Sequence, residues 1–117
     1  MENNSMKFSH ASPVFAVINI QETINFYCNQ LGFSSEFEWG NPVDYAVLLR
    51  DGVKIHFSQL DKESTSPIAK DTRVLIIFVY DVNEIYKEIA GKKVNITKEI
   101  DDRNYGMRDF DVMDNNG

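Results

Sequence analysis

The chain has 117 residues, of which 43% are hydrophobic and 26% are charged, and its formal net charge at pH 7 is −6. This length and composition suit one soluble globular domain. The negative charge argues against nucleic acid as a partner, because nucleic acid selects basic surfaces, and it suits a neutral or cationic small ligand.

The cysteine content and the termini predict a compartment. The single cysteine, Cys28, cannot form an intrachain disulfide, which favours a reducing environment. The first residues have neither the basic nor the apolar region of a signal peptide. The longest apolar run, Val74 to Tyr80, is too short to cross a bilayer. We therefore predict a cytoplasmic protein that does not contact membranes.

The first half of the chain reads as a strand, a helix and three further strands. Asn19 caps the helix, Glu22 completes a capping box, and Gly32 ends it. Alternating aromatic and polar residues then predict a strand, and Asp51-Gly52 predicts a tight turn between two more. The predicted elements are a strand over 13–18, a helix over 20–31, and strands over 33–39, 44–49 and 53–58.

A polar linker, residues 61–71, precedes a second unit built on the same pattern. Val74 to Tyr80 is rich in β-branched residues and apolar on both faces, which predicts a strand buried on both sides. Asp81 caps the next helix and Gly91 ends it. Strands are expected over 94–100 and 105–113, followed by the turn residues Asp114 to Gly117.

The two units form an internal repeat. Asn19-Ile20-Gln21-Glu22 superposes on Asp81-Val82-Asn83-Glu84, which divides the single domain 1–117 into a first module over about 8–60 and a second over 72–117. The second module needs a last strand equivalent to 53–58, and the sequence reaches Gly117 without it. We expect either that the natural protein is longer or that a neighbouring chain completes the sheet.

Four stretches carry a resemblance to a known family. They are Val17-Ile18-Asn19-Ile20 followed by Phe26 to Phe33, Leu48 to Phe57 around Asp51-Gly52, Val79-Tyr80-Asp81-Val82, and Tyr105-Gly106-Met107-Arg108 followed by Asp114-x-x-Gly117. Their order and spacing resemble the glyoxalase / bleomycin resistance / extradiol dioxygenase (vicinal oxygen chelate) superfamily, with Asn19 in place of the usual Asp. The resemblance implies an α+β domain of two tandem βαβββ modules, the glyoxalase/bleomycin resistance/dihydroxybiphenyl dioxygenase fold, here apparently without its last strand.

Metal ligands separate the activities within that superfamily. Glyoxalases and dioxygenases hold a divalent ion with His and Glu side chains. The resemblance places these positions on or near Ser12, on His56, on Leu75 and on the missing strand. Only His56 can bind a metal at ordinary affinity, and a metal centre needs three or four donors. We predict no cofactor; the alternative is a lyase or dioxygenase that uses Zn, Mn, Fe or Ni, with His56 as a weak candidate ligand.

The bleomycin resistance branch resembles the chain better. Its members lack the metal site and use the same cavity, at a homodimer interface, to sequester a large cationic drug. Ser12-Pro13 is similar to the Thr-Pro of that branch, and Tyr105-Gly106-Met107-Arg108 to its Trp-Gly-Met-Arg. The resemblance implies a homodimeric antibiotic resistance protein that binds an aromatic or cationic small molecule without catalysis. A regulatory or immunity-type partner module with an occluded cavity is a third hypothesis.

Aromatic and polar side chains at strand positions are the candidates for a ligand site, because flat rings bind planar and cationic groups. Phe33 and Phe37 line either a cavity or the core, whereas Trp39 favours the cavity because it lies at a strand end. Arg108 binds a ligand or forms a structural ion pair. The predicted ligand-binding residues are Phe37, Trp39, Tyr45, His56, Tyr105 and Arg108, and no catalytic residue is predicted.

Overall fold

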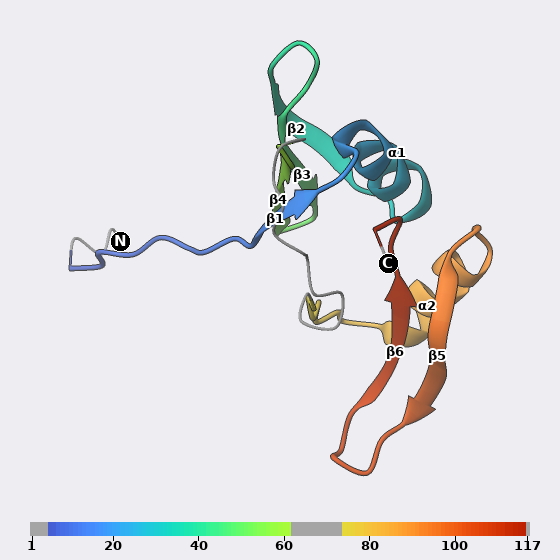
Figure 1. Ribbon diagram of the computed structural model, residues 1–117. Coiled ribbons are helices and arrows are strands. Elements are labelled where there is room, and N and C mark those ends of the chain that lie inside the picture. The colour runs from blue at the N-terminus through green and yellow to red at the C-terminus, as the bar shows by residue number, and fades with distance from the viewer. Residues whose placement is uncertain (1–4, 62–73, 117) are drawn as a thin grey trace.

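The computed structural model describes residues 5–61 and 74–116 (Figure 1). Within these residues it contains two helices and six strands, and the predicted linker lies outside them except for Asp61. Neither helix is long and apolar enough to span a bilayer. The elements are β1 (Val14–Val17), α1 (Ile20–Gln30), β2 (Ser34–Trp39), β3 (Tyr45–Arg50), β4 (Val53–Gln59), α2 (Val82–Ala90), β5 (Asn95–Asp102) and β6 (Arg108–Met113).

The first half folds as a four-stranded sheet with the order β1-β4-β3-β2 and α1 on one face. β4 pairs in parallel with β1 and antiparallel with β3, and the Asp51-Gly52 turn predicted from sequence joins β3 to β4, with Asp51 at a φ of 53°. Ile55 and Phe57 point from β4 towards α1 and are almost fully buried. This half contains most of the hydrophobic core: Val17, Ile20, Ile24, Tyr27, Phe33, Ala46, Leu48, Ile55 and Phe57.

Helix α1 begins where the sequence predicts. Asn19 is in an extended conformation and its Oδ1 accepts the backbone N–H of Glu22 at 3.1 Å. The side chain of Gln59, at the end of β4, also accepts the N–H of Ile20 at 2.8 Å, so the helix start is tied to the sheet. Two of the N–H groups that a helix start leaves open are therefore satisfied by side chains.

A bulge in β2 divides the aromatic residues that the sequence places on one strand face. The register with β3 shifts between Ser35 and Phe37. Phe33, which precedes the strand, is buried and packs edge-on against Tyr27 with ring centroids 5.5 Å apart. Phe37 is half exposed on the other side of the bulge. Phe33 therefore belongs to the core, because the extra residue of a bulge breaks the two-residue alternation.

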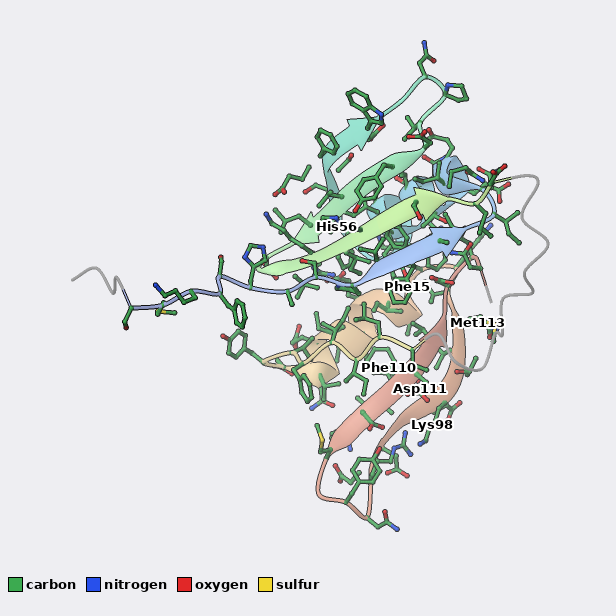
Figure 2. The ribbon with its side chains drawn as sticks, turned by 60° about the vertical axis from the view of Figure 1, so that its left-hand side comes forward. Phe15, His56, Lys98, Phe110, Asp111 and Met113 are labelled. Carbon is green, nitrogen blue, oxygen red and sulfur yellow. The ribbon has the colours of Figure 1, made fainter. Side chains whose placement is uncertain are left out.

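The second half contains α2 and the antiparallel pair β5–β6. The cap of α2 repeats that of α1, since Asp81 Oδ1 accepts the N–H of Glu84 at 3.2 Å. Tyr86 of α2 lies edge-on to Phe110 of β6, with ring centroids 5.0 Å apart. Phe110 is labelled in Figure 2. The α+β arrangement expected from the sequence is thereby confirmed.

The prediction of a buried strand over Val74 to Tyr80 is wrong. These residues form no strand, and their side chains are exposed, from 38% for Leu75 to fully exposed for Tyr80. The composition suits a central strand, but a strand is buried only where neighbours pair with it and cover it. In residues 5–61 and 74–116 no other segment pairs with this one.

Polar contacts between described residues join the two halves. Arg50, at the end of β3, forms a two-pronged ion pair with Glu88 of α2, with N–O distances of 2.7 and 2.9 Å, and also donates to Leu31 O. Elsewhere Tyr27 of α1 donates to Asp114 at 2.7 Å. The side chains of Asn115 and Asn116 reach the buried Thr23 of α1, which fixes the turn after β6.

Gly32 follows Leu31, whose carbonyl oxygen accepts a hydrogen bond from Arg50, and its backbone conformation suits glycine. Its φ is +74°, and a Cβ there would lie 3.0 Å from Arg50 Nη1. We expect Gly32→Ala to lower the free energy of unfolding by about 1–2 kcal/mol, from backbone strain and displacement of the guanidinium. Urea denaturation measures this value.

Gly91→Ala is the matched control, because Gly91 ends α2 at a φ of −78° and a Cβ there would make only ordinary contacts. It should change stability by less than about 1 kcal/mol. Equal losses for the two variants would contradict the role given to Gly32.

The Arg50–Glu88 pair makes stability depend on pH. Hydrogen bonds from Arg50 hold the pKa of the Glu88 carboxyl below its usual value. A lowered folded-state pKa gives a contribution that is complete above the unfolded pKa of about 4.3 and is lost as the pH falls through the lowered value. Glu88→Gln should thus cost up to about 1 kcal/mol at pH 7 and progressively less below pH 4.

Chemical denaturation across that pH range tests the prediction. Glu99→Gln, which changes an exposed carboxyl of β5, serves as the control and should follow the parent protein at every pH. A difference between the parent protein and Glu88→Gln that is constant with pH would rule out the ion pair as its cause.

Candidate functional site

The candidate site is the face of the first sheet that α1 does not cover. Side chains alternate along a strand, so His56 points away from the face on which Ile55 and Phe57 pack against α1 (Figure 2). His56 lies opposite Val47 of β3 and Val14 of β1. Lys54 and Ser58 lie two residues to either side of His56 on β4 and share this face, and we call the surface the open face.

Tyr45 and His56 form a hydrogen-bonded pair on the open face. Tyr45 Oη lies 2.6 Å from His56 Nδ1, and the two rings meet edge to face with centroids 5.7 Å apart. Both side chains are half-buried. The pair fixes the imidazole ring and leaves Nε2 as the nitrogen that can serve a ligand.

Exposed aromatic rings from β2 border this pair. Phe37 pairs in register with Val47 and Trp39 with Tyr45, so both share the open face. Phe37 is 49% exposed and Trp39 is 65% exposed. Such a cluster of uncovered rings on a sheet face marks an interaction surface.

The open face also contains residues that the sequence analysis did not single out. Val47 is buried, although it lies outside the core cluster, and Val14 is exposed beside His56. Lys54 forms an ion pair with Glu36 at 3.0 Å. Counting alternate residues back from the Asp51-Gly52 turn would have placed Val47 on this face. The position of Glu36 depends on the bulge in β2, which has no signal in the sequence.

Tyr105 and Arg108 do not lie beside the open face within one chain. They belong to the β5–β6 hairpin, whose tip points away from the first sheet in Figure 1. Arg108 forms an ion pair with Asp102 at 3.2 Å and donates a hydrogen bond to Asn83. Within one chain it therefore forms the structural ion pair, which was one of the two roles expected for it. Tyr105 is 59% exposed and its hydroxyl donates to Asp109 at 2.5 Å.

The hairpin tip is organised by the carboxylate of Asp109. Arg103 Nε donates to this group at 2.7 Å, and Tyr105 donates to its other oxygen. Hydrogen bonds from Arg103 and then Tyr105 lower the pKa of Asp109, and the same bond to Asp109 raises the pKa of Tyr105. Tyr105 is therefore a neutral aromatic group held at a fixed position.

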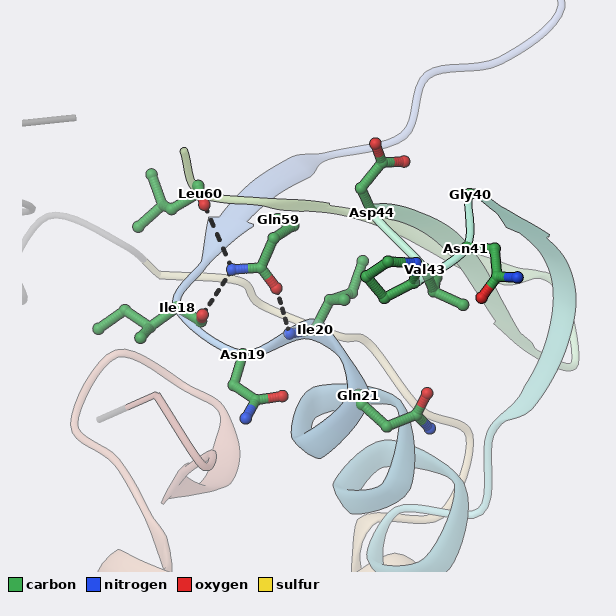
Figure 3. Close-up of a pocket in the computed structure, with 11 residues that line it drawn as sticks. Ile18, Asn19, Ile20, Gln21, Gly40, Asn41, Val43, Asp44, Gln59 and Leu60 are labelled. Carbon is green, nitrogen blue, oxygen red and sulfur yellow. Dashed lines mark hydrogen bonds between the residues drawn. The ribbon is translucent and has the colours of Figure 1, made fainter. Parts of the chain in front are cut away.

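A groove of about 690 Å³ lies elsewhere, between the start of α1 and the loop that joins β2 to β3 (Figure 3). Its polar lining groups serve the local structure: Gln59 bonds to Ile18 O and Ile20 N, and Asn19 caps α1. None of the six predicted site residues lines it. We therefore place the candidate site on the open face, where the exposed rings gather, and not in the groove.

The open face does not fit a metal centre. His56 Nδ1 is engaged by Tyr45, and no group of three His, Cys, Asp or Glu side chains in residues 5–61 and 74–116 is arranged to hold an ion. The family resemblance places further ligand positions on or near Ser12 and on Leu75, and neither side chain is a metal donor at ordinary affinity.

His10 and Cys28 have side chains that could carry chemistry, but they lie outside the open face. His10 lies in the N-terminal arm, where Nδ1 is 2.7 Å from the Ser9 hydroxyl. Cys28 is half-buried on α1, and burial, followed by the charge of Glu38, raises the pKa of its thiol. A raised pKa means little thiolate, so Cys28 is not an activated nucleophile.

Comparison with known proteins gives one family. The family model described as "Glyoxalase/Bleomycin resistance protein/Dioxygenase superfamily" matches residues 7–117. No curated protein sequence matches the chain.

Solved structures share the fold. The bleomycin-binding protein of Streptomyces verticillus, crystallised with copper(II)-bleomycin, is 24% identical with a TM-score of 0.75, over 96% of this chain and 92% of that one. A bleomycin resistance determinant encoded on the transposon Tn5 is 16% identical with a TM-score of 0.75, over 94% and 92%. An integron cassette protein from the mobile metagenome of V. cholerae is 27% identical with a TM-score of 0.63, over 96% and 91%.

The Tyr45–His56 bond can be measured by a double-mutant cycle. Tyr45→Phe alone leaves His56 Nδ1 without its partner and should lower the free energy of unfolding by about 0.5–1.5 kcal/mol. His56→Phe in the Tyr45→Phe background should cost less than it does in the parent protein, which gives a coupling energy near 1 kcal/mol. Additive losses would show that the two groups do not interact in solution.

Proposed function

The chain belongs to the glyoxalase/bleomycin resistance protein/dioxygenase superfamily, and we propose that it is a small-molecule binding protein of the bleomycin resistance type. The observation that carries the proposal is the open face, where the rings of Phe37 and Trp39 are exposed next to the Tyr45–His56 pair. Flat rings bind planar groups by stacking and cations by cation–π contact, and the net charge of −6 favours a cationic ligand.

The named relatives support the same class of ligand. One solved structure of this fold is described as a bleomycin-binding protein with copper(II)-bleomycin, and another as a bleomycin resistance determinant. Bleomycin is thus the first compound to test, and the ligand class is an aromatic, cationic small molecule. Sequestration needs no catalytic group, and we assign none.

A homodimer completes the proposed site. In one chain the β5–β6 hairpin and the open face lie apart, so Tyr105 and Arg108 cannot serve the same ligand as Trp39 and His56. We place the hairpin of one subunit over the open face of the other, with Tyr105 as a fixed ring that closes the cavity. The protein acts in the cytoplasm in this proposal, where a sequestered drug is kept from its target.

Calorimetry tests the ligand site. Titration of the protein with metal-free bleomycin should give saturable heat, and Trp39→Ala should weaken binding about tenfold or more, because it removes a ring worth about 1–2 kcal/mol. Phe8→Ala, which removes an exposed ring of the N-terminal arm, is the control and should bind as the parent protein does.

Equal affinity for the parent protein and Trp39→Ala would place the ligand elsewhere. No heat with bleomycin or with other planar cationic drugs would refute the function itself. Sedimentation of the free protein tests the dimer separately, since the proposal requires two chains per particle.

A further inference from the structure

His56, labelled in Figure 2, is the polar member of a row of side chains that crosses the open face from strand to strand. In register with it are Val14 on β1, Val47 on β3 and, beyond Val47, Phe37 on β2. Val47 is buried, whereas Val14 and Phe37 are about half exposed. A ligand that lies along this row therefore meets the imidazole ring between apolar surfaces.

The hydrogen bond to Tyr45 determines which ring nitrogen of His56 carries the proton. Tyr45 Oη lies 2.6 Å from His56 Nδ1, and such a bond needs one donor and one acceptor. A phenol hydroxyl is a stronger donor than a neutral imidazole, and an unprotonated imidazole nitrogen is the stronger acceptor. The Tyr45 hydroxyl therefore donates to Nδ1, and the single N–H of the neutral ring is on Nε2.

The N–H of His56 Nε2 is left for a ligand. Among residues 5–61 and 74–116, no group forms a hydrogen bond with Nε2, while Nδ1 is bonded to Tyr45. The imidazole is half-buried, so its edge is reached from the open face.

We propose that Tyr45 is a positioning residue that keeps the proton of His56 on Nε2, and that His56 thereby selects ligands with a hydrogen-bond acceptor at this point. The acceptor is the oxygen of a carbonyl or amide group on an aromatic, cationic molecule. This selection rests on the proposed function, whose ligand class it narrows.

The other polar side chains of the open face do not select in this way. The Lys54 ammonium group is paired with Glu36 at 3.0 Å, so its charge is already compensated. The hydroxyl of Ser58 both donates and accepts, and it therefore tolerates either kind of ligand group. Nε2–H of His56 only donates, so a ligand donor placed against it would leave two groups unpaired. His56 is therefore the residue that discriminates.

The sheet also sets the distance between the acceptor and the aromatic part of the ligand. β3 lies between β2 and β4. Neighbouring strands lie about 4.8 Å apart, so Phe37 and His56 are separated by two spacings, or about 10 Å. The expected ligand is a planar cation whose carbonyl or amide oxygen lies about 10 Å from the ring that stacks on Phe37.

Nitrogen NMR of the free protein with ¹⁵N-labelled histidine tests the role of Tyr45 without any ligand. The chain has two histidines, and His56→Phe identifies the signals of His56. At about pH 8.5, where a free imidazole is neutral, Nε2 should give the signal of a protonated nitrogen and Nδ1 that of an unprotonated one. Tyr45→Phe should shift both signals towards the mixture of forms of a free imidazole. Tyr86→Phe, which changes a ring of α2 that contacts Phe110, is the control and should leave them unchanged.

Calorimetry with two probes tests the selection. The first probe is a quinolinium ion that carries an acetamide at the end of a four-carbon linker. The second carries an alkyl chain of the same length without the carbonyl oxygen. The ratio of the two affinities should shift about fivefold against the acetamide probe in His56→Phe relative to the parent protein. Comparing ratios cancels the difference in hydrophobicity between the probes.

Two results would overturn the inference. One is a proton on Nδ1 of His56 in the parent protein, or ring signals that Tyr45→Phe does not change. The other is binding of both probes with an affinity ratio that is the same in the parent protein and in His56→Phe. Failure of the proposed function looks different, because neither probe nor metal-free bleomycin would then bind the parent protein. Ligand selection would fail with it, whereas the ring signals would still decide the role of Tyr45.

Discussion

The pairing of β4 with both β1 and β3 is the interaction on which the first half of the molecule depends. β1 pairs with no other strand in residues 5–61 and 74–116, so its place beside the hairpin is fixed by the backbone of β4. β4 also carries Gln59, which binds the start of α1. One strand therefore sets the sheet order, the position of the helix and the composition of both sheet faces.

The two-residue period of β4 separates the residues of the core from those of the proposed site. Ile55 and Phe57 face α1 and complete the core, while His56 between them faces the open side and binds Tyr45. Because α1 buries one face of the sheet, the core does not need the rings on the other face. Exposed rings such as Phe37 and Trp39 are typical of an interaction surface. Within the described part of the second half no strand pairs with residues 74–80, and their side chains are exposed despite their apolar composition.

Sequence reasoning succeeded where short-range chemistry decides the structure. The helix caps at Asn19 and Asp81 and the turn at Asp51 need only a few neighbouring residues, and all three were predictable. Alternation along β4 puts His56 on the face opposite Ile55 and Phe57, and Trp39 and Tyr45 share that face. The fold class followed because these signals repeat in the second half.

Predictions that depend on distant partners fared less well. Phe33 and Phe37 look equivalent in the sequence, but the bulge against β3 sends only Phe33 to the core. The burial expected for residues 74–80 requires a pairing strand that composition cannot supply. The Arg50–Glu88 ion pair joins residues 38 positions apart, so no local sequence pattern predicts it. Whether Tyr105 and Arg108 reach a ligand depends on a second subunit, so it stays a prediction.

The most direct test of the central claim uses the fluorescence of Trp39, which is the single tryptophan of the chain and lies on the open face. Its emission should change in a saturable way, in intensity or wavelength, when metal-free bleomycin is added to the intact protein. An emission spectrum that stays the same through saturating concentrations of bleomycin and of other planar cationic drugs would contradict a ligand site on the open face.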